Sequence, residues 1–93
     1  MTIFKYLLPI QDCVELDLPY TSRVLSVGNQ RGELCLWATM PEHVCTCKRF
    51  ILIVGTGMDA PIPSEARFVG TVQIEPFVWH VFECEGETRY PPA

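Results

Sequence analysis

Short segments of β-forming residues, separated by proline and glycine, are the feature that most limits how this chain can fold. Turn residues recur roughly every eight to twelve positions, the spacing typical of small all-β domains. No segment gives strong support to a helix. The expected strands are residues 2–8, 13–18, 23–29, 33–39, 49–54, 67–75 and 77–83. We therefore predict an all-β barrel or sandwich of about seven strands, with at most one short helical turn, at 63–66.

The pattern inside three of these segments predicts how the strands are placed. Residues 13–18 alternate between apolar and acidic side chains, so this strand should be half-exposed. Residues 49–54 are nearly all apolar, which indicates a central strand buried on both faces. The turn at 29–32 contains asparagine and glycine and predicts a hairpin, and the break at Pro76 predicts a second, closing hairpin.

Composition indicates one folded domain. The 93 residues are 48% hydrophobic and 19% charged, which excludes disorder as the default state. The last residues are polar and end in prolines. We expect a single β domain over 1–84 and a loosely ordered tail over 85–93.

Net charge and cysteine content limit the classes of partner and the cellular compartment that fit this sequence. The net charge is −4 and the basic residues are scattered, which disfavours a nucleic-acid binder. The first residues are typical of a strand and not of a signal peptide, and no apolar run approaches the ~20 residues of a membrane span. Five cysteines, an odd number, are expected as reduced thiols, with Cys13, Cys35 and Cys84 acting as small core residues. A cytoplasmic protein without membrane contact is the prediction.

The glycine turn at Gly55, Thr56 and Gly57 is the candidate ligand site. Neither the Walker lysine nor the helix that opens after a Rossmann glycine loop is present. One interpretation is that these glycines only supply the positive φ angles of a tight connection. The other is that backbone N–H groups of the turn bind an anion, with Arg67 supplying charge across the loop.

Two further residue patterns suggest chemistry. His43, Cys45 and Cys47 lie close together, but zinc sites prefer cysteine pairs with two to four residues between them and a fourth ligand, so we predict no metal. His80 is interpreted either as an interior histidine or as a polar wall of a pocket. A pairing of His80 with Cys35 or Cys84 as a nucleophilic dyad has no motif to support it, so no catalytic residue and no cofactor are predicted.

Aromatic residues occur in almost every expected strand, and most should be core. Trp37 or Trp79 is the candidate for an exposed ring that stacks on a planar ligand, with Arg23, Arg31 or Arg67 nearby for its phosphates. The apolar runs at 50–54 and 77–82 also favour a homo-oligomer, most simply a dimer.

The order of several short motifs resembles a family of small, uncharacterised phage and prophage proteins. The motifs are FKYLLPI (4–10), VLSVGNQRGELCLWA (24–38), VGTG (54–57), FVGTVQ (68–73) and WHVFE (79–83). The resemblance covers about residues 3–84. It implies a small protein made in a bacterial cell by a virus or prophage, a setting in which compact proteins blunt host immunity.

Three functions follow from these expectations. The leading one is a non-catalytic sponge that sequesters a nucleotide-derived immune signal, of cyclic nucleotide or ADP-ribose type. Its site would combine Gly55, Thr56 and Gly57 with Arg67, Trp37 or Trp79, and His80. The alternatives are an inhibitor or adaptor that binds a host protein through a sheet edge or apolar patch, and a small hydrolase of such a ligand.

Overall fold

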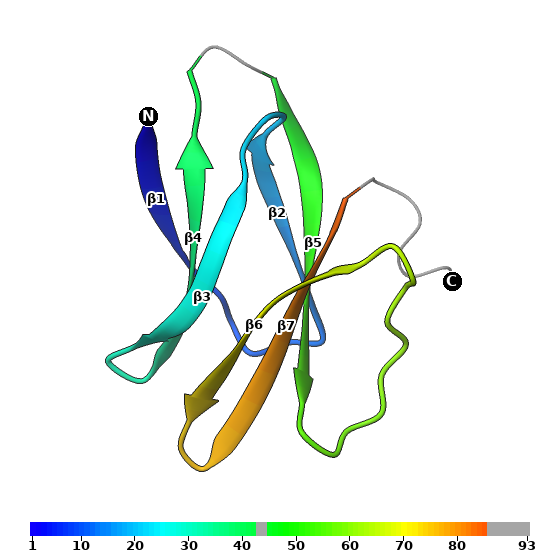
Figure 1. Cartoon of the computed structure of the whole chain (residues 1–93). Helices are drawn as coiled ribbons and strands as arrows, with labels where there is room; N and C mark the ends of the chain where they lie inside the picture. Colours follow the sequence, from blue (N-terminus) through cyan, green and yellow to red (C-terminus); the bar gives the residue numbers. More distant parts are fainter. Residues whose placement is uncertain (43–44, 86–93) are drawn as a thin grey trace.

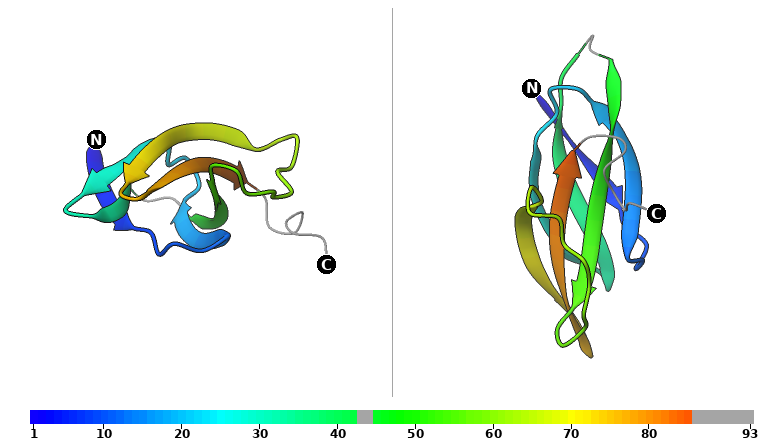
Figure 2. Two further views of the ribbon diagram at one scale, coloured as in Figure 1. Left: turned by 90° about the horizontal axis from the view of Figure 1, so that it is seen from below. Right: turned by 90° about the vertical axis from the view of Figure 1, so that its right-hand side faces the viewer.

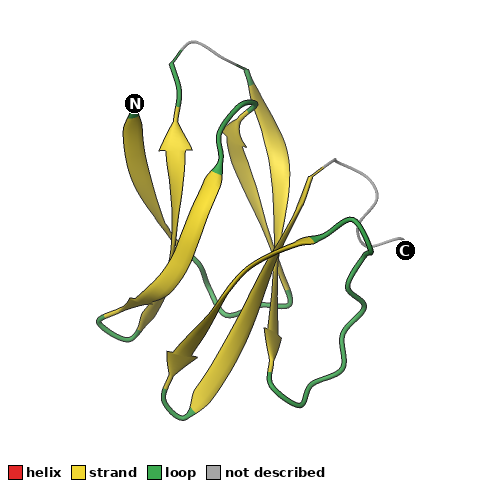
Figure 3. Ribbon diagram, in the orientation of Figure 1, coloured by secondary structure: helices red, strands yellow, loops and turns green. Residues whose placement is uncertain are grey.

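The computed structural model describes residues 1–42 and 45–85. Its seven strands are β1 (Thr2–Leu7), β2 (Cys13–Pro19), β3 (Val24–Gln30), β4 (Glu33–Met40), β5 (Thr46–Gly55), β6 (Arg67–Ile74) and β7 (Phe77–Glu85). No helix occurs among the described residues, so the predicted all-β class is confirmed (Figure 3). The turn expected at 63–66 is a single hydrogen-bonded turn, in which the Ala66 N–H donates to the Pro63 carbonyl at 3.0 Å.

The strands form two antiparallel sheets that make a sandwich. One sheet has the order β1-β4-β3, and the other has the order β2-β5-β7-β6 (Figure 1). β5 is the longest strand, and residues 49–53 within it are buried, as predicted for the central strand. β3 and β6, an edge strand of each sheet, lie side by side in all views (Figures 1 and 2).

Both predicted hairpins are present, and their turns explain their sequences. β3 and β4 are joined through Arg31 and Gly32, which have φ angles of 57° and 84°. Positive φ at both central positions is the type I′ pattern, whose twist matches that of the flanking strands. The Asn29 side chain accepts the Gly32 N–H at 2.8 Å, which fixes the turn. β6 and β7 pair from Arg67↔Glu83 to Ile74↔Phe77 on either side of the Pro76 turn.

Alternating side chains of the two sheets form one apolar core between them. Its buried members are Leu8, Val14, Leu18, Val24, Leu34, Leu36, Ala38, Ile51, Ile53, Val72 and Val81. At β3 and β6 the backbones approach closely, because a Cβ on Gly70 would lie 3.0 Å from the side chain of Val27. The Asn29 side-chain amide also donates to the Gln73 carbonyl across this contact, at 3.0 Å.

The expected division into domain and tail falls largely beyond what the structure describes. Glu85, the first residue of the expected tail, is the last residue of β7. Residues 86–93 lie outside the described residues. Within the described part of the chain there is no helix long and apolar enough to cross a membrane.

Candidate functional site

The glycine turn after β5 uses most of its backbone donors inside the fold. The Met58 N–H donates to the Gly55 carbonyl at 3.0 Å, and Gly57 has a φ of 87°. Positive φ at the third position of a four-residue turn is the type II pattern, which favours glycine there. The Thr56 N–H donates to the Val78 carbonyl at 3.1 Å. The turn therefore fits a tight connection better than a row of free N–H groups facing an anion.

His80 lies beside this turn, on the face of its sheet that points away from the core. One imidazole nitrogen, Nε2, is 2.6 Å from the Thr56 hydroxyl, and the other, Nδ1, is 3.0 Å from the Thr71 hydroxyl. Thr71 reaches the ring because β6 and β7 pair it directly with His80. Both ring nitrogens therefore bond to hydroxyl groups, in place of the Cys35 or Cys84 thiol of the dyad considered from the sequence.

The two tryptophans belong to different sheets. The half-buried Trp79 packs against the core from β7, and a Cβ on Gly55 would lie 3.2 Å from its ring. Trp37 in β4 alternates with the core residues Leu36 and Ala38, so its ring lies on the outer face of the other sheet, against Gly28.

The structure thus divides the predicted ligand residues into three groups. Gly55, Thr56, Gly57, Trp79 and His80 lie around the end of β5. Arg67 is at the opposite end of its hairpin, paired with Glu83, because the strand register separates it from the glycine turn. Trp37 is on the other sheet. The ligand-binding role of each residue remains a prediction, but the seven do not form one pocket.

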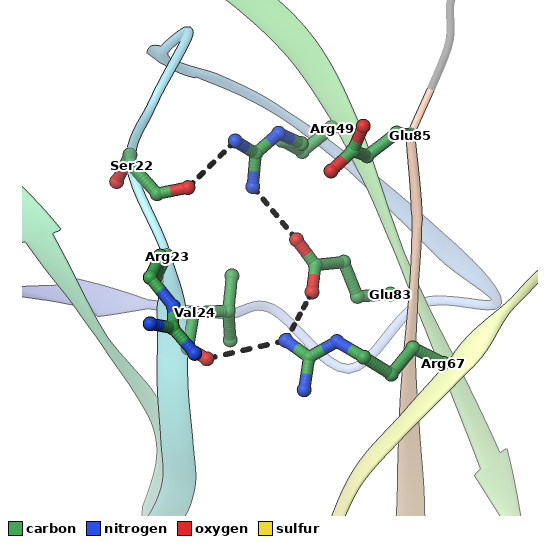
Figure 4. A pocket seen from close by; sticks show the side chains of 7 residues that line it. All are labelled: Ser22, Arg23, Val24, Arg49, Arg67, Glu83 and Glu85. Atoms are coloured by element: carbon green, nitrogen blue, oxygen red, sulfur yellow. Dashed lines mark hydrogen bonds and ion pairs between the residues drawn. The ribbon is translucent and has the colours of Figure 1, made fainter.

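Arg67 instead belongs to an ion triad with Arg49 and Glu83 at the polar end of the core. Glu83 accepts a hydrogen bond from Arg49 at 2.7 Å and another from Arg67 at 2.5 Å (Figure 4). The side chains of Arg49 and Glu83 are 3% and 6% exposed, whereas that of Arg67 is 57% exposed. All three continue the core-facing alternation of β5, β7 and β6, so the inner face changes there from apolar to ionic.

The triad holds the connection between β2 and β3 against the four-stranded sheet. Arg49 donates to the carbonyls of Tyr20 at 3.2 Å and Ser22 at 2.7 Å, and Arg67 donates to that of Val24 at 3.2 Å. A guanidinium group with several donors in a planar fork suits this role, because it bonds a carboxylate and backbone carbonyls together.

A cavity of about 230 Å³ lies between the triad and this connection (Figure 4). We name it the arginine cavity. Its lining residues are Ser22, Arg23, Val24, Arg49, Arg67, Glu83 and Glu85. Two irregularities of strand register adjoin it, one after Val24 in β3 and one after Phe68 in β6. Bulges of this kind redirect side chains and are frequent beside functional sites.

Two cationic groups of the cavity have unused donors. The Nε of Arg49 is buried and has no hydrogen-bond partner in the described part of the chain. A buried donor without a partner costs about 1–3 kcal/mol. The Arg23 side chain is exposed, and no hydrogen bond or ion pair of its guanidinium occurs within residues 1–42 and 45–85.

Sequence reasoning missed Arg49 and Glu83, whereas Arg23 was among the arginines expected near a ligand's phosphates. A signal for the first two was present, because each lies at a core-facing position of an otherwise apolar strand, two residues from Ile51 and Val81 respectively. A charge at such a position predicts a buried partner. Which residues pair there depends on register, which the sequence pattern alone does not fix.

The cysteines show no sign of a metal site or an activated thiol. His43 lies outside the described residues, Cys45 is exposed and Cys47 is half-buried. No group of three or more potential metal ligands gathers within the described ranges. Burial raises the pKa of the Cys13 thiol, and Glu15, Cys84 and Asp12 raise it further, so Cys13 is a weaker nucleophile than an ordinary thiol at neutral pH.

The comparison with protein families gives one match. Residues 1–90 match the family described as Domain of unknown function (DUF7352). The chain belongs to this family. Comparisons with curated proteins and with solved structures each gave no match. Membership in DUF7352 therefore brings no activity with it, and function has to be argued from the residues themselves.

The first prediction concerns the triad. Glu83→Ala leaves the buried Arg49 without its carboxylate, so we expect it to lower the free energy of unfolding by about 3–5 kcal/mol, measured by urea denaturation. Glu85→Ala removes a carboxylate from the exposed end of the same strand and should have a much smaller effect. Equal effects of the two substitutions would contradict a stabilising role for the triad.

The second prediction concerns metal. Protein purified without chelators should contain no stoichiometric zinc by elemental analysis, because His43, Cys45 and Cys47 lack the spacing and the fourth ligand of a structural site. About one zinc per chain would overturn this prediction.

Proposed function

We propose that this DUF7352 domain is a non-catalytic protein that binds and sequesters a small anionic ligand in the arginine cavity. The observation that carries the proposal is that Arg49, which lines a cavity of about 230 Å³, has a buried Nε with no hydrogen-bond partner among the described residues. An anion that bonds this N–H would supply the acceptor that it lacks in the described structure.

The charge balance of the cavity supports an anion. Three arginines face two glutamates, in a protein whose net charge is −4. Glu83 is already bonded to Arg49 and Arg67, which leaves Arg23 as the cation without a partner among the described residues. Arginine suits phosphate because its planar fork can bond two phosphate oxygens at once.

The hydrogen bond made by the Ser22 hydroxyl, in the wall of the cavity, favours a binding role over a catalytic one. The Ser22 hydroxyl donates to the Thr39 carbonyl, which ties it to β4. A nucleophilic serine needs a base to accept its proton. His80, the described histidine, is engaged with Thr56 and Thr71 on the outer face of the sheet.

The biological setting of the proposal rests on the resemblance to phage and prophage proteins. In that setting the ligand is a nucleotide-derived immune signal, and the domain acts as a sponge in the cytoplasm of an infected bacterium. The ligand's phosphate would occupy the arginine cavity, in place of the glycine turn that the sequence suggested.

The third prediction tests sequestration directly. The protein is incubated with cyclic dinucleotides and with cyclic ADP-ribose isomers, and the free ligand is quantified before and after heat denaturation. We expect one of these ligands to be depleted and then released unchanged. At a free concentration of ~100 times its dissociation constant, this ligand should also raise the free energy of unfolding by about 2.7 kcal/mol. Release of an altered ligand would support the hydrolase alternative, and no depletion of any ligand would contradict sequestration.

Arg23→Ala separates ligand binding from stability in this assay, because the Arg23 guanidinium makes no hydrogen bond or ion pair among the described residues. Arg23→Ala should weaken binding by about 1.5–3 kcal/mol, the value of a hydrogen bond to a charged group, with little change in stability. Arg67→Ala should weaken binding by at least ~1.5 kcal/mol, but it also removes a partner of Glu83. Arg31→Ala, in the β3–β4 turn, is the matched control. Equal loss of affinity in Arg23→Ala and Arg31→Ala would move the site elsewhere.

A second proposal, assembly into a homodimer, is favoured by the exposed strand β1. Ile3, Phe4 and Leu7 are 53%, 46% and 57% exposed, and β1 pairs only with β4 in its sheet. A free edge with apolar side chains is a template for pairing with another strand. If the β1 strands of two copies pair antiparallel with their Phe4 residues opposite each other, Lys5 of one copy lies opposite Ile3 of the other. The two lysines then do not face each other.

The fourth prediction tests this assembly. Light scattering at micromolar concentration should show a particle of twice the 10.6 kDa chain mass, and Phe4→Glu should convert it to the monomer. Leu25→Glu, at a similarly exposed apolar residue of β3, is the control and should leave the dimer intact. A wild-type protein that is monomeric under these conditions would exclude the dimer and leave β1 to a different protein partner.

A further inference from the structure

We infer that the arginine cavity recognises a sugar phosphate, with the arginines taking the phosphate and Glu85 accepting hydrogen bonds from the sugar hydroxyls. This inference rests on the proposed binding function and assigns the chemical class of the ligand. It makes Glu85 a specificity-determining residue, separate in role from Glu83.

The position of Glu85 separates it from the triad. β5 and β7 pair Glu85 directly with Arg49, and Glu83 lies two residues earlier on the same face of β7. Figure 4 shows the Glu85 carboxylate beside Arg49, apart from the dashed contacts that join Arg49, Glu83 and Arg67. No hydrogen bond or ion pair of the Glu85 side chain occurs among the described residues. Its two oxygens are therefore available as acceptors at the cavity.

The two carboxylates have different consequences for an incoming anion. Glu83 is paired with two guanidinium groups, whereas the Glu85 side chain makes no ion pair among the described residues. An unneutralised carboxylate repels a bare phosphate dianion but accepts hydrogen bonds from hydroxyl groups. Acidic side chains bind ribose hydroxyls in this way in dinucleotide-binding folds. A phosphate ester that carries a vicinal diol can bond to the arginines through its phosphate and to Glu85 through its hydroxyl groups.

The size of the cavity limits how much of a nucleotide it encloses. Pockets for drug-sized ligands are usually ~300–1,000 Å³, and this one is about 230 Å³. It accommodates a phosphate and a pentose better than a complete nucleotide. A base attached to the sugar would lie outside the arginine cavity.

Titration calorimetry with three simple probes tests the assignment. The probes are inorganic phosphate, ribose 5-phosphate, and phosphoethanolamine, which replaces the diol with an ammonium group. We expect ribose 5-phosphate to bind at least about tenfold more tightly than inorganic phosphate, the effect of one charge-assisted hydrogen bond. In Glu85→Ala this preference should fall to less than about threefold, because inorganic phosphate gains affinity and the sugar loses its acceptor. Glu33→Ala, at the exposed start of β4, should keep the full preference.

Each of the other outcomes contradicts a different part of the assignment. If inorganic phosphate and ribose 5-phosphate bind equally well to the wild-type protein, the sugar assignment fails and the anion site stands. If phosphoethanolamine binds most tightly, Glu85 selects a cation and the diol assignment is overturned. If no probe binds and the cyclic nucleotides are also not depleted, the proposed function fails together with this inference.

Discussion

The ion pairs of buried Glu83 with Arg49 and Arg67 hold the sandwich together at the polar end of its core. Removing an ion pair from water is expensive, and the attraction between the charges repays the cost only when further hydrogen bonds complete the geometry. Here the guanidinium groups also bond the carbonyls of Tyr20, Ser22 and Val24. The triad thereby fixes the β2–β3 connection to the four-stranded sheet where the apolar core ends.

The same arrangement explains why a cavity forms there. Apolar side chains such as Ile51 and Val81 fill the space between the sheets over most of the core. Long ionic side chains replace them at this end and leave one donor, the Nε of Arg49, without an acceptor in the described chain. Native proteins rarely leave such a group unpaired, and this donor is the observation on which the proposed anion site rests. Under the proposed function, the residues that brace the β2–β3 connection would also bind the ligand.

Much of the fold was predictable because it depends on local patterns. Proline and glycine marked the strand ends, the apolar run at 49–54 identified β5, and the asparagine and glycine at 29–32 identified the β3–β4 hairpin. The site was less predictable because it depends on register. Arg67 was expected beside Gly57, but pairing of β6 with β7 places it opposite Glu83. Trp37 and Trp79 were equivalent in the sequence, and only the sheet order places them on different sheets.

The central claim, that an anion enters the arginine cavity and bonds the free Arg49 donor, can be tested at that atom. Arginine side-chain ¹H–¹⁵N spectra of the full chain are recorded while inorganic phosphate is added, with Arg31 in the exposed β3–β4 turn as the internal reference. The account predicts a saturable shift of the Arg49 Nε–H resonance, with the Arg31 resonance nearly unchanged. An Arg49 resonance that stays fixed up to millimolar phosphate, or that moves only in parallel with Arg31, would contradict it.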